Sequence, residues 1–253
     1  MALINLNFFS EALRTQQEVS IVIPQKSTDG EIGIENSGKS DKFKCLFLLH
    51  GLSDNHTIWL RRTSIERYAQ KAGLAVVMPS ADRSFYTDMK YGGKYYTYVA
   101  NELPRVIREF FNVSDKREDN FIAGLSMGGY GTLKIGMKEC DRFCACAGLS
   151  STADIQGIKD RFPNDYKNIF GEDGIPASED LFDIASQCVN NPNRPKIFMG
   201  VGTEDYNYES NIKLKKHLQN LGFDLTYKDS RGTHSWDFWD EYIQYVLTWI
   251  LEQ

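Results

Sequence analysis

The sequence has 253 residues, of which 42% are hydrophobic and 25% are charged, a composition that is ordinary for a globular protein with a sizeable core. The net charge of -5 and the pI of about 5.5 give no electrostatic case for a nucleic acid or an anionic membrane as partner. No apolar run approaches the roughly 18 residues that span a bilayer. Residues 1–20 also lack the basic and apolar stretches of a secretion signal, so we expect a cytoplasmic protein.

The cysteines support the same expectation. There are five, an odd number, and most lie in apolar runs, which favours buried thiols in a reducing compartment. A metal site or a reactive thiol is the alternative, but no histidine near the 144–146 pair completes a zinc set. The five are Cys45, Cys140, Cys144, Cys146 and Cys188.

Strand-like and helix-like patterns alternate along the chain. The run 43–49 is apolar except for Lys44, which is typical of a strand buried on both faces. Pro104 lies inside a helical pattern and predicts either a kink or a helix start. The polar segment 26–42 indicates a hairpin loop, and residues 151–192 show no clear pattern of helices or strands. Strands are expected at 3–9, 18–23, 43–49, 74–78, 120–123, 143–149, 196–201 and 223–227, and helices at 62–72, 99–111, 130–138, 211–221 and 236–251.

This alternation predicts an α/β fold. Strands that alternate with helices form βαβ units, which give a mostly parallel central sheet flanked by helices. We find no internal repeat or linker and expect one domain over residues 1–253. Active sites in such sheets lie beyond the carboxyl ends of the strands, so candidate residues are sought there.

A G-x-S-x-G motif stands between the expected strand 120–123 and the helix 130–138. It reads Gly124-Leu125-Ser126-Met127-Gly128, the pattern of a nucleophile elbow, in which a serine occupies a strained turn from strand to helix. Glycines are needed where strand and helix cross closely. The pattern alone is equally compatible with a glycine-rich turn that carries a surface serine.

A serine nucleophile needs a base, and the base needs an orienting acid. His234 follows the strand 223–227 and is the favoured base; the alternative is a loop histidine that caps the last helix. The strand 196–201 leads to two acids, Glu204 and Asp205, and we favour Asp205 because its short side chain suits the turn. The resulting order of serine, acid and histidine is that of α/β-hydrolases.

Acyl transfer also needs two backbone N–H groups that hold the developing oxyanion. The residue after the nucleophile, Met127, is expected to supply one of them. The loop His50-Gly51-Leu52 follows the early buried strand, and we assign the second to the amide of Leu52. A glycine turn without a role in the reaction is the alternative.

Aromatic residues are the candidates for substrate contact. Trp59, Tyr86 and Trp236 could line an acyl or alcohol pocket, since aromatic rings give apolar area with a polar tip. The alternative for the tyrosine-rich stretch 85–98 is loop packing on the sheet edge.

Several stretches together resemble the esterase D-like serine esterases, most closely the small bacterial tributyrin esterases. They read FLLHGLSDNHTIW, VVMPSADRSFYTDMKYGGKYYTYVANELPRVI, FIAGLSMGGYGTLK, VGTEDYNYESN and GTHSWDFWDEYI. The likeness runs from about residue 4 to the C-terminus and is weakest at 25–42 and 151–192.

The resemblance implies an α/β-hydrolase fold with a small cap at 151–192 and hydrolysis of short-chain acyl esters of small molecules. It places the nucleophile at Ser126, the acid at Asp205, the base at His234 and the oxyanion amides at Leu52 and Met127. No metal or organic cofactor is needed for this chemistry. Family members are often dimers or tetramers, so the resemblance implies a homo-oligomer.

Other activities on the same residues stay open. S-formylglutathione hydrolases belong to the broader family, but their oxyanion loop usually reads like HGLTCTDEN, whereas this chain has Ser53-Asp54-Asn55-His56. This departure makes a thioesterase less favoured. Carbohydrate acetyl or feruloyl esterases, acyltransferases and a non-catalytic binding protein are the remaining alternatives.

Overall fold

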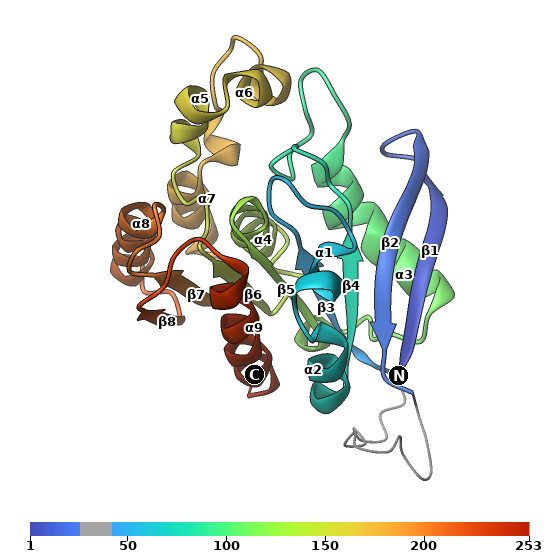
Figure 1. Ribbon diagram of the computed structural model, residues 1–253. Coiled ribbons are helices and arrows are strands. Elements are labelled where there is room, and N and C mark those ends of the chain that lie inside the picture. Colours follow the sequence, from blue (N-terminus) through green and yellow to red (C-terminus); the bar gives the residue numbers. More distant parts are fainter. Residues whose placement is uncertain (26–41, 253) are drawn as a thin grey trace.

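The computed structural model describes residues 1–25 and 42–252, and its centre is an eight-stranded sheet (Figure 1). The order of the strands is β1-β2-β4-β3-β5-β6-β7-β8. Their bounds are β1 (Ala2–Ser10), β2 (Thr15–Ile23), β3 (Lys44–Leu49), β4 (Leu74–Pro79), β5 (Asn120–Leu125), β6 (Ala145–Leu149), β7 (Lys196–Gly202) and β8 (Leu225–Ser230).

The sheet is mostly parallel, as expected from the alternation of strands and helices. β4, β3, β5, β6, β7 and β8 are parallel to their neighbours in this series, while β1 and β2 form an antiparallel hairpin that joins β4 antiparallel. All residues of β4 and β5 are buried, which explains why both sequences are apolar apart from Asn120 at the start of β5. The segment 26–42, expected to be a loop, lies outside the described residues apart from Lys42.

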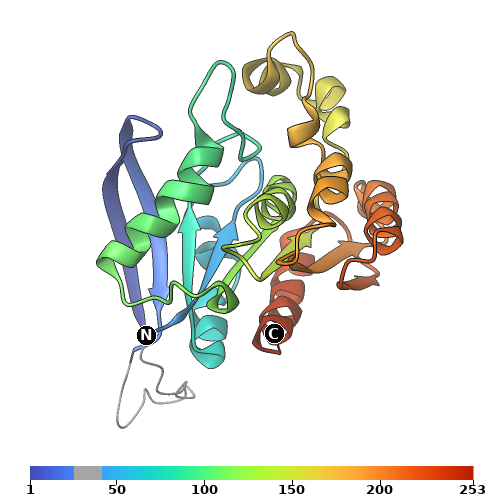
Figure 2. The same cartoon turned by 180° about the vertical axis from the view of Figure 1, so that it is seen from behind.

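Helices cover both faces of the sheet (Figures 1 and 2). The helices α3, α4, α7 and α8 pack on one face with one buried apolar cluster, and α2 and α9 pack on the other with a second cluster. No described helix is long and apolar enough to cross a membrane. The bounds are α1 (Ile58–Arg62), α2 (Ile65–Ala72), α3 (Leu103–Phe110), α4 (Met127–Lys138), α5 (Ile158–Arg161), α6 (Pro163–Phe170), α7 (Leu181–Cys188), α8 (Tyr208–Asn220) and α9 (Trp236–Leu251).

Pro104 is the second residue of α3, and the backbone is already helical before it, since Glu102 and Leu103 have right-handed helical dihedral angles. The proline therefore lies where the hydrogen-bonding pattern of the helix changes and not at a free helix end. A π-helical stretch, η1 (Thr97–Glu102), leads directly into α3.

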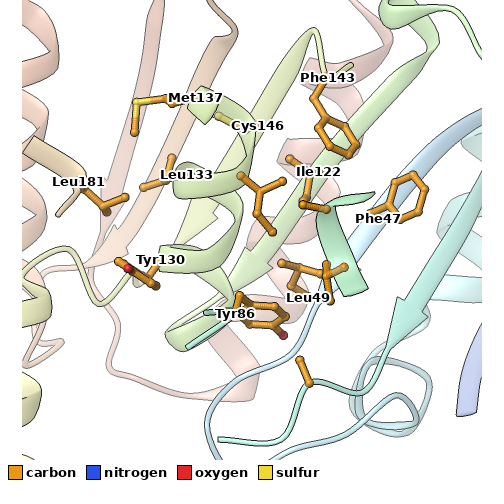
Figure 3. Close-up of a cluster of buried hydrophobic side chains, with 14 of the residues drawn as sticks. Phe47, Leu49, Tyr86, Ile122, Tyr130, Leu133, Met137, Phe143, Cys146 and Leu181 are labelled. Carbon is orange, nitrogen blue, oxygen red and sulfur yellow. The ribbon is translucent and has the colours of Figure 1, made fainter. Parts of the chain in front are cut away.

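The helix α4 lies against the centre of the sheet. Figure 3 shows Leu133 and Tyr130 on the side of α4 toward Leu181 of α7, with Leu49 of β3 and Ile122 of β5 on the other side of the helix. Beside them Phe47 and Phe143 meet edge to face, with their ring centroids 5.7 Å apart. These residues belong to one buried apolar cluster between the sheet and the helices on this face.

The segment between β6 and β7 forms a small cap. Residues 151–192, which the sequence left unordered, contain the short helices α5, α6 and α7 and two 3₁₀ turns, η3 (Ile155–Gly157) and η4 (Ala177–Glu179). Both views place α5 and α6 beyond the carboxyl ends of the parallel strands, at the same end as the loop that follows β4 (Figures 1 and 2).

A buried ion pair ties this cap to α4. Lys134 has no exposed side-chain surface, and its Nζ donates to Glu179 of η4 at 2.6 Å, to the hydroxyl of Thr87 at 2.7 Å and to the carbonyl of Phe85 at 3.2 Å. Burial lowers the pKa of Lys134 to about 8, against the opposing attraction of Glu179. One ammonium group therefore joins α4, the loop after β4 and the cap.

Neutralising Glu179 should destabilise the fold strongly. The variant Glu179→Gln leaves Lys134 buried without its counter-charge, and we expect a loss of about 3 kcal/mol in the free energy of unfolding, measured by urea denaturation. The matched control is Glu172→Gln, which removes an exposed partner of Lys167 and should change stability little. Equal losses in the two variants would contradict a structural role for the buried pair.

Candidate active site

Ser126 lies in a strained turn between β5 and α4. Its φ of 56° and ψ of -115° fall where side chains other than glycine are rare. A Cβ on Gly128 would lie 2.6 Å from the carbonyl oxygens of Leu49 and His50, and a Cβ on Gly124 would lie 2.8 Å from the backbone of Gly128. Both glycines of the motif are therefore required by the close crossing of strand and helix.

Three side chains from different loops meet at this turn. The Nε2 atom of His234 lies 2.9 Å from Oγ of Ser126, and its Nδ1 atom lies 2.8 Å from Oδ2 of Asp205. Asp205 follows β7 and His234 follows β8, so the carboxyl edge of the sheet brings them together. The geometry thus joins the three residues that the sequence singles out as nucleophile, acid and base.

The surroundings of Asp205 keep it ionised. Its side chain has no exposed surface, and burial alone would raise its pKa. The hydrogen bond and charge of His234, the amide of Asn207 at 2.8 Å and the hydroxyl of Ser150 outweigh burial, so the pKa of Asp205 is lowered. The other acid considered in the sequence, Glu204, instead pairs with Arg231 at 3.1 Å.

Ser150 helps to position Asp205, and the sequence analysis did not identify it. It follows β6 with a φ of 47°, is fully buried, and shares a hydrogen bond with Asp205. Its hydroxyl accepts the indole N–H of Trp239 at 3.1 Å, and the ring of Trp239 meets the imidazole of His234 edge to face. Its position directly after a strand, at the same edge of the sheet as the other candidates, could have identified it from the sequence.

The two segments to which the oxyanion amides are assigned lie next to Ser126 in the fold. Met127 is the first residue of α4, so its N–H is among those that the helix leaves free. A Cβ on Gly51 would lie 3.8 Å from Cβ of Ser126, which places the loop containing Leu52 next to the serine. The helix N-terminus adds a partial positive charge at the same point.

A buried neutral histidine supports this loop. His50 is 1% exposed, and its Nε2 accepts the amide N–H of Ala81 at 2.8 Å, which leaves the proton on Nδ1, 2.7 Å from the carbonyl oxygen of Gly51. Burial is the main cause that lowers the pKa of His50 to about 4. The ring therefore stays uncharged at neutral pH and links the loop to the residues after β4.

Two of the three aromatic residues expected to contact substrate do not. Trp59 is 1% exposed and donates its indole N–H to the carbonyl of Leu49 at 3.1 Å, and Tyr86 is 0% exposed and donates its hydroxyl to the carbonyl of His50 at 2.9 Å. Those two expectations are wrong, because side chains without exposed surface cannot touch a ligand here. They hold the end of β3 and its loop instead. Trp236 is partly exposed, and its contact with substrate stays a prediction.

The family model described as "Putative esterase" matches residues 10–249 of this chain. The chain belongs to this esterase family. It is therefore a carboxylic ester hydrolase with an α/β-hydrolase fold, as the sequence led us to expect.

Individual relatives of this esterase span nearly the whole chain. An acetyl esterase of Caldicellulosiruptor saccharolyticus is 32% identical over 99% of this chain and 98% of its own. Among solved structures, the substrate-bound fluorophosphonate-binding serine hydrolase FphF of Staphylococcus aureus has a TM-score of 0.89 at 33% identity. The S-formylglutathione hydrolase FrmB of the same organism has a TM-score of 0.87 at 32% identity. Each structural match covers 99% of this chain and 98% of the other.

Removing the indole N–H of Trp239 should slow the esterase. The variant Trp239→Phe keeps an aromatic ring near His234 but leaves the hydroxyl of Ser150 less firmly placed against Asp205. We expect kcat/KM for p-nitrophenyl acetate to fall about fivefold, the size of one hydrogen bond. Unchanged kinetics in a variant of unchanged stability would contradict the positioning role of this bond.

The neutral state of His50 should make stability depend on pH. Its folded pKa of about 4 lies below the ordinary value of 6.5, so the stability it contributes is complete above pH 6.5 and is lost as the pH falls toward 4. Glutamine at this position can accept the amide of Ala81 without titrating. Between pH 7 and pH 4 the free energy of unfolding should therefore fall by about 3 kcal/mol more in the wild type than in His50→Gln. Parallel pH profiles of the two proteins in urea denaturation would refute the assignment.

Proposed function

We propose that this esterase hydrolyses short-chain acyl esters of small molecules through an acyl-serine intermediate. The observation that carries the proposal is the hydrogen-bonded series Ser126–His234–Asp205 at the end of a strained strand-to-helix turn. A serine hydroxyl becomes a nucleophile when a neighbouring base accepts its proton, and here that base is already within hydrogen-bond distance.

In the first step, Oγ of Ser126 attacks the ester carbonyl carbon while its proton moves to Nε2 of His234. Asp205 accepts the Nδ1–H bond, which fixes the tautomer of the ring and stabilises the imidazolium. The carbonyl oxygen becomes an oxyanion held by the amides of Leu52 and Met127. The tetrahedral intermediate then collapses, and the C–O bond to the alcohol breaks. The alcohol takes the proton from His234 as this C–O bond breaks, which completes the first step and leaves the acyl-serine.

In the second step the acyl-serine is hydrolysed. A water molecule then loses a proton to the same nitrogen and attacks the acyl carbon, and the acid product departs as Ser126 regains its proton. The chain's own groups supply all of these proton transfers.

Three observations support short acyl groups and a cytoplasmic enzyme. The relative from Caldicellulosiruptor saccharolyticus is named an acetyl esterase. The cap has helices of only four to eight residues and is anchored by the buried pair of Lys134 and Glu179, which favours a fixed, small pocket over a large mobile lid. The five cysteines are all buried free thiols, which fits a reducing compartment.

Thioester hydrolysis is the second candidate, and it is favoured by the likeness to FrmB. The same serine, base and oxyanion amides would cleave a C–S bond, with a thiol as leaving group. Comparing kcat/KM for S-formylglutathione with that for p-nitrophenyl acetate separates the two. A preference of two orders of magnitude or more for the thioester would replace the first proposal with the second.

The acyl-chain preference is tested with p-nitrophenyl esters from acetate to dodecanoate. We expect a sharp fall in kcat/KM once the acyl chain exceeds about eight carbons, since a short pocket excludes longer chains. In Ser126→Ala, turnover of all esters should fall by roughly a millionfold. Near-normal turnover in that variant would contradict the nucleophile, and equal rates at all lengths would contradict the short-chain preference.

A further inference from the structure

A cation and an exposed aromatic ring border the imidazole of His234. Tyr206 directly follows Asp205, is 61% exposed, and has its ring centroid 4.3 Å from that of His234. The guanidinium carbon of Arg161, at the end of α5 in the cap, lies 4.4 Å from the ring centroid of Tyr206. The cap therefore extends a positive charge toward the solvent side of the candidate base.

Tyr206 and Arg161 lie on the side of His234 where the leaving group of the substrate is expected. The departing alcohol takes its proton from His234, so its substituents lie beside the imidazole, away from the carbonyl oxygen held by the oxyanion amides. The buried Trp239 already packs against this ring edge to face. Tyr206 and Arg161 are therefore the groups that an alcohol of more than a few atoms would meet as it extends into solvent.

Arg161 has no acidic partner among the residues that the structure describes. Other arginines nearby are paired, Arg83 with Asp165 at 2.6 Å and Arg231 with Glu204 at 3.1 Å. Within residues 1–25 and 42–252, no carboxylate lies within ion-pair distance of Arg161, and its hydrogen bond goes to the side-chain oxygen of Asn207 at 3.4 Å. The planar guanidinium group of arginine carries several N–H donors, which match the two oxygens of a carboxylate.

We propose that Arg161 and Tyr206 form the leaving-group subsite and select esters whose alcohol or thiol carries a carboxylate. Tyr206 supplies an apolar surface beside the reacting bond, and Arg161 binds the anionic group beyond it. This inference rests on the proposed function, because it takes His234 as the group that protonates the leaving atom.

The test compares two esters that differ in charge far from the bond that breaks. These are the acetate esters of 4-(hydroxymethyl)benzoate and of 4-(hydroxymethyl)benzamide. The wild type should prefer the carboxylate about fivefold in kcat/KM, the size expected of an exposed ion pair, and the preference should shrink in about 1 M salt. Arg161→Gln should lower kcat/KM for the carboxylate alone, and Arg161→Lys should keep part of the preference because it retains the charge.

The matched control is Arg194→Gln. Arg194 is also exposed and also lies over an aromatic ring, that of Phe223 at 5.7 Å, but it precedes β7 at the opposite edge of the sheet. The variant loses the same charge and should keep the wild-type preference. An equal loss of preference in both arginine variants would show that only the net charge of the protein acts, and would overturn the subsite.

Two other outcomes would overturn the inference while leaving the esterase mechanism intact. They are the absence of any charge preference in the wild type, and an equal fall for both esters in Arg161→Gln, which would give Arg161 a purely structural role in the cap. The same holds if neither benzyl ester is cleaved while p-nitrophenyl acetate is. If p-nitrophenyl acetate is not cleaved either, the proposed function itself fails.

Discussion

The site depends on the close crossing of β5 and α4. Gly124 and Gly128 meet with no room for a side chain, and this contact forces Ser126 into a backbone conformation that only the surrounding packing can maintain. The same crossing places the serine at the N-terminus of α4 and at the carboxyl edge of the sheet. There the loops after β7 and β8 deliver Asp205 and His234.

Buried polar side chains hold the loops around that turn. His50, Trp59 and Tyr86 satisfy backbone groups at the end of β3 and in the loop after it, and Lys134 joins α4 to the cap through Glu179. Such groups are costly to bury unless each finds a partner, so together they restrict the loops to one arrangement. The reacting groups can therefore be aligned before a substrate arrives.

Much of this could be predicted because strand ends in a parallel sheet share one edge. The G-x-S-x-G motif identified Ser126, and the rule about strand ends identified Asp205 and His234. The apolar periodicity of the last helix gave its bounds, Trp236–Leu251, without error. Trp59 and Tyr86 were misassigned because a sequence does not distinguish an aromatic residue that lines a pocket from one whose polar tip holds a buried carbonyl. The role of Ser150 could not be predicted, because it depends on β6 and β7 being neighbours in the sheet. The helices of the cap could not be predicted either, because helices this short have too few turns to show a periodic pattern.

The proposed mechanism requires Ser126 to be the activated nucleophile. The most direct measurement is labelling of the native protein with a fluorophosphonate, followed by mass spectrometry of the digested adduct. We expect one phosphonyl group per chain, on the peptide that contains Ser126, and slow labelling when His234 is replaced by alanine. No adduct, an adduct on another residue, or labelling that does not depend on His234 would contradict it.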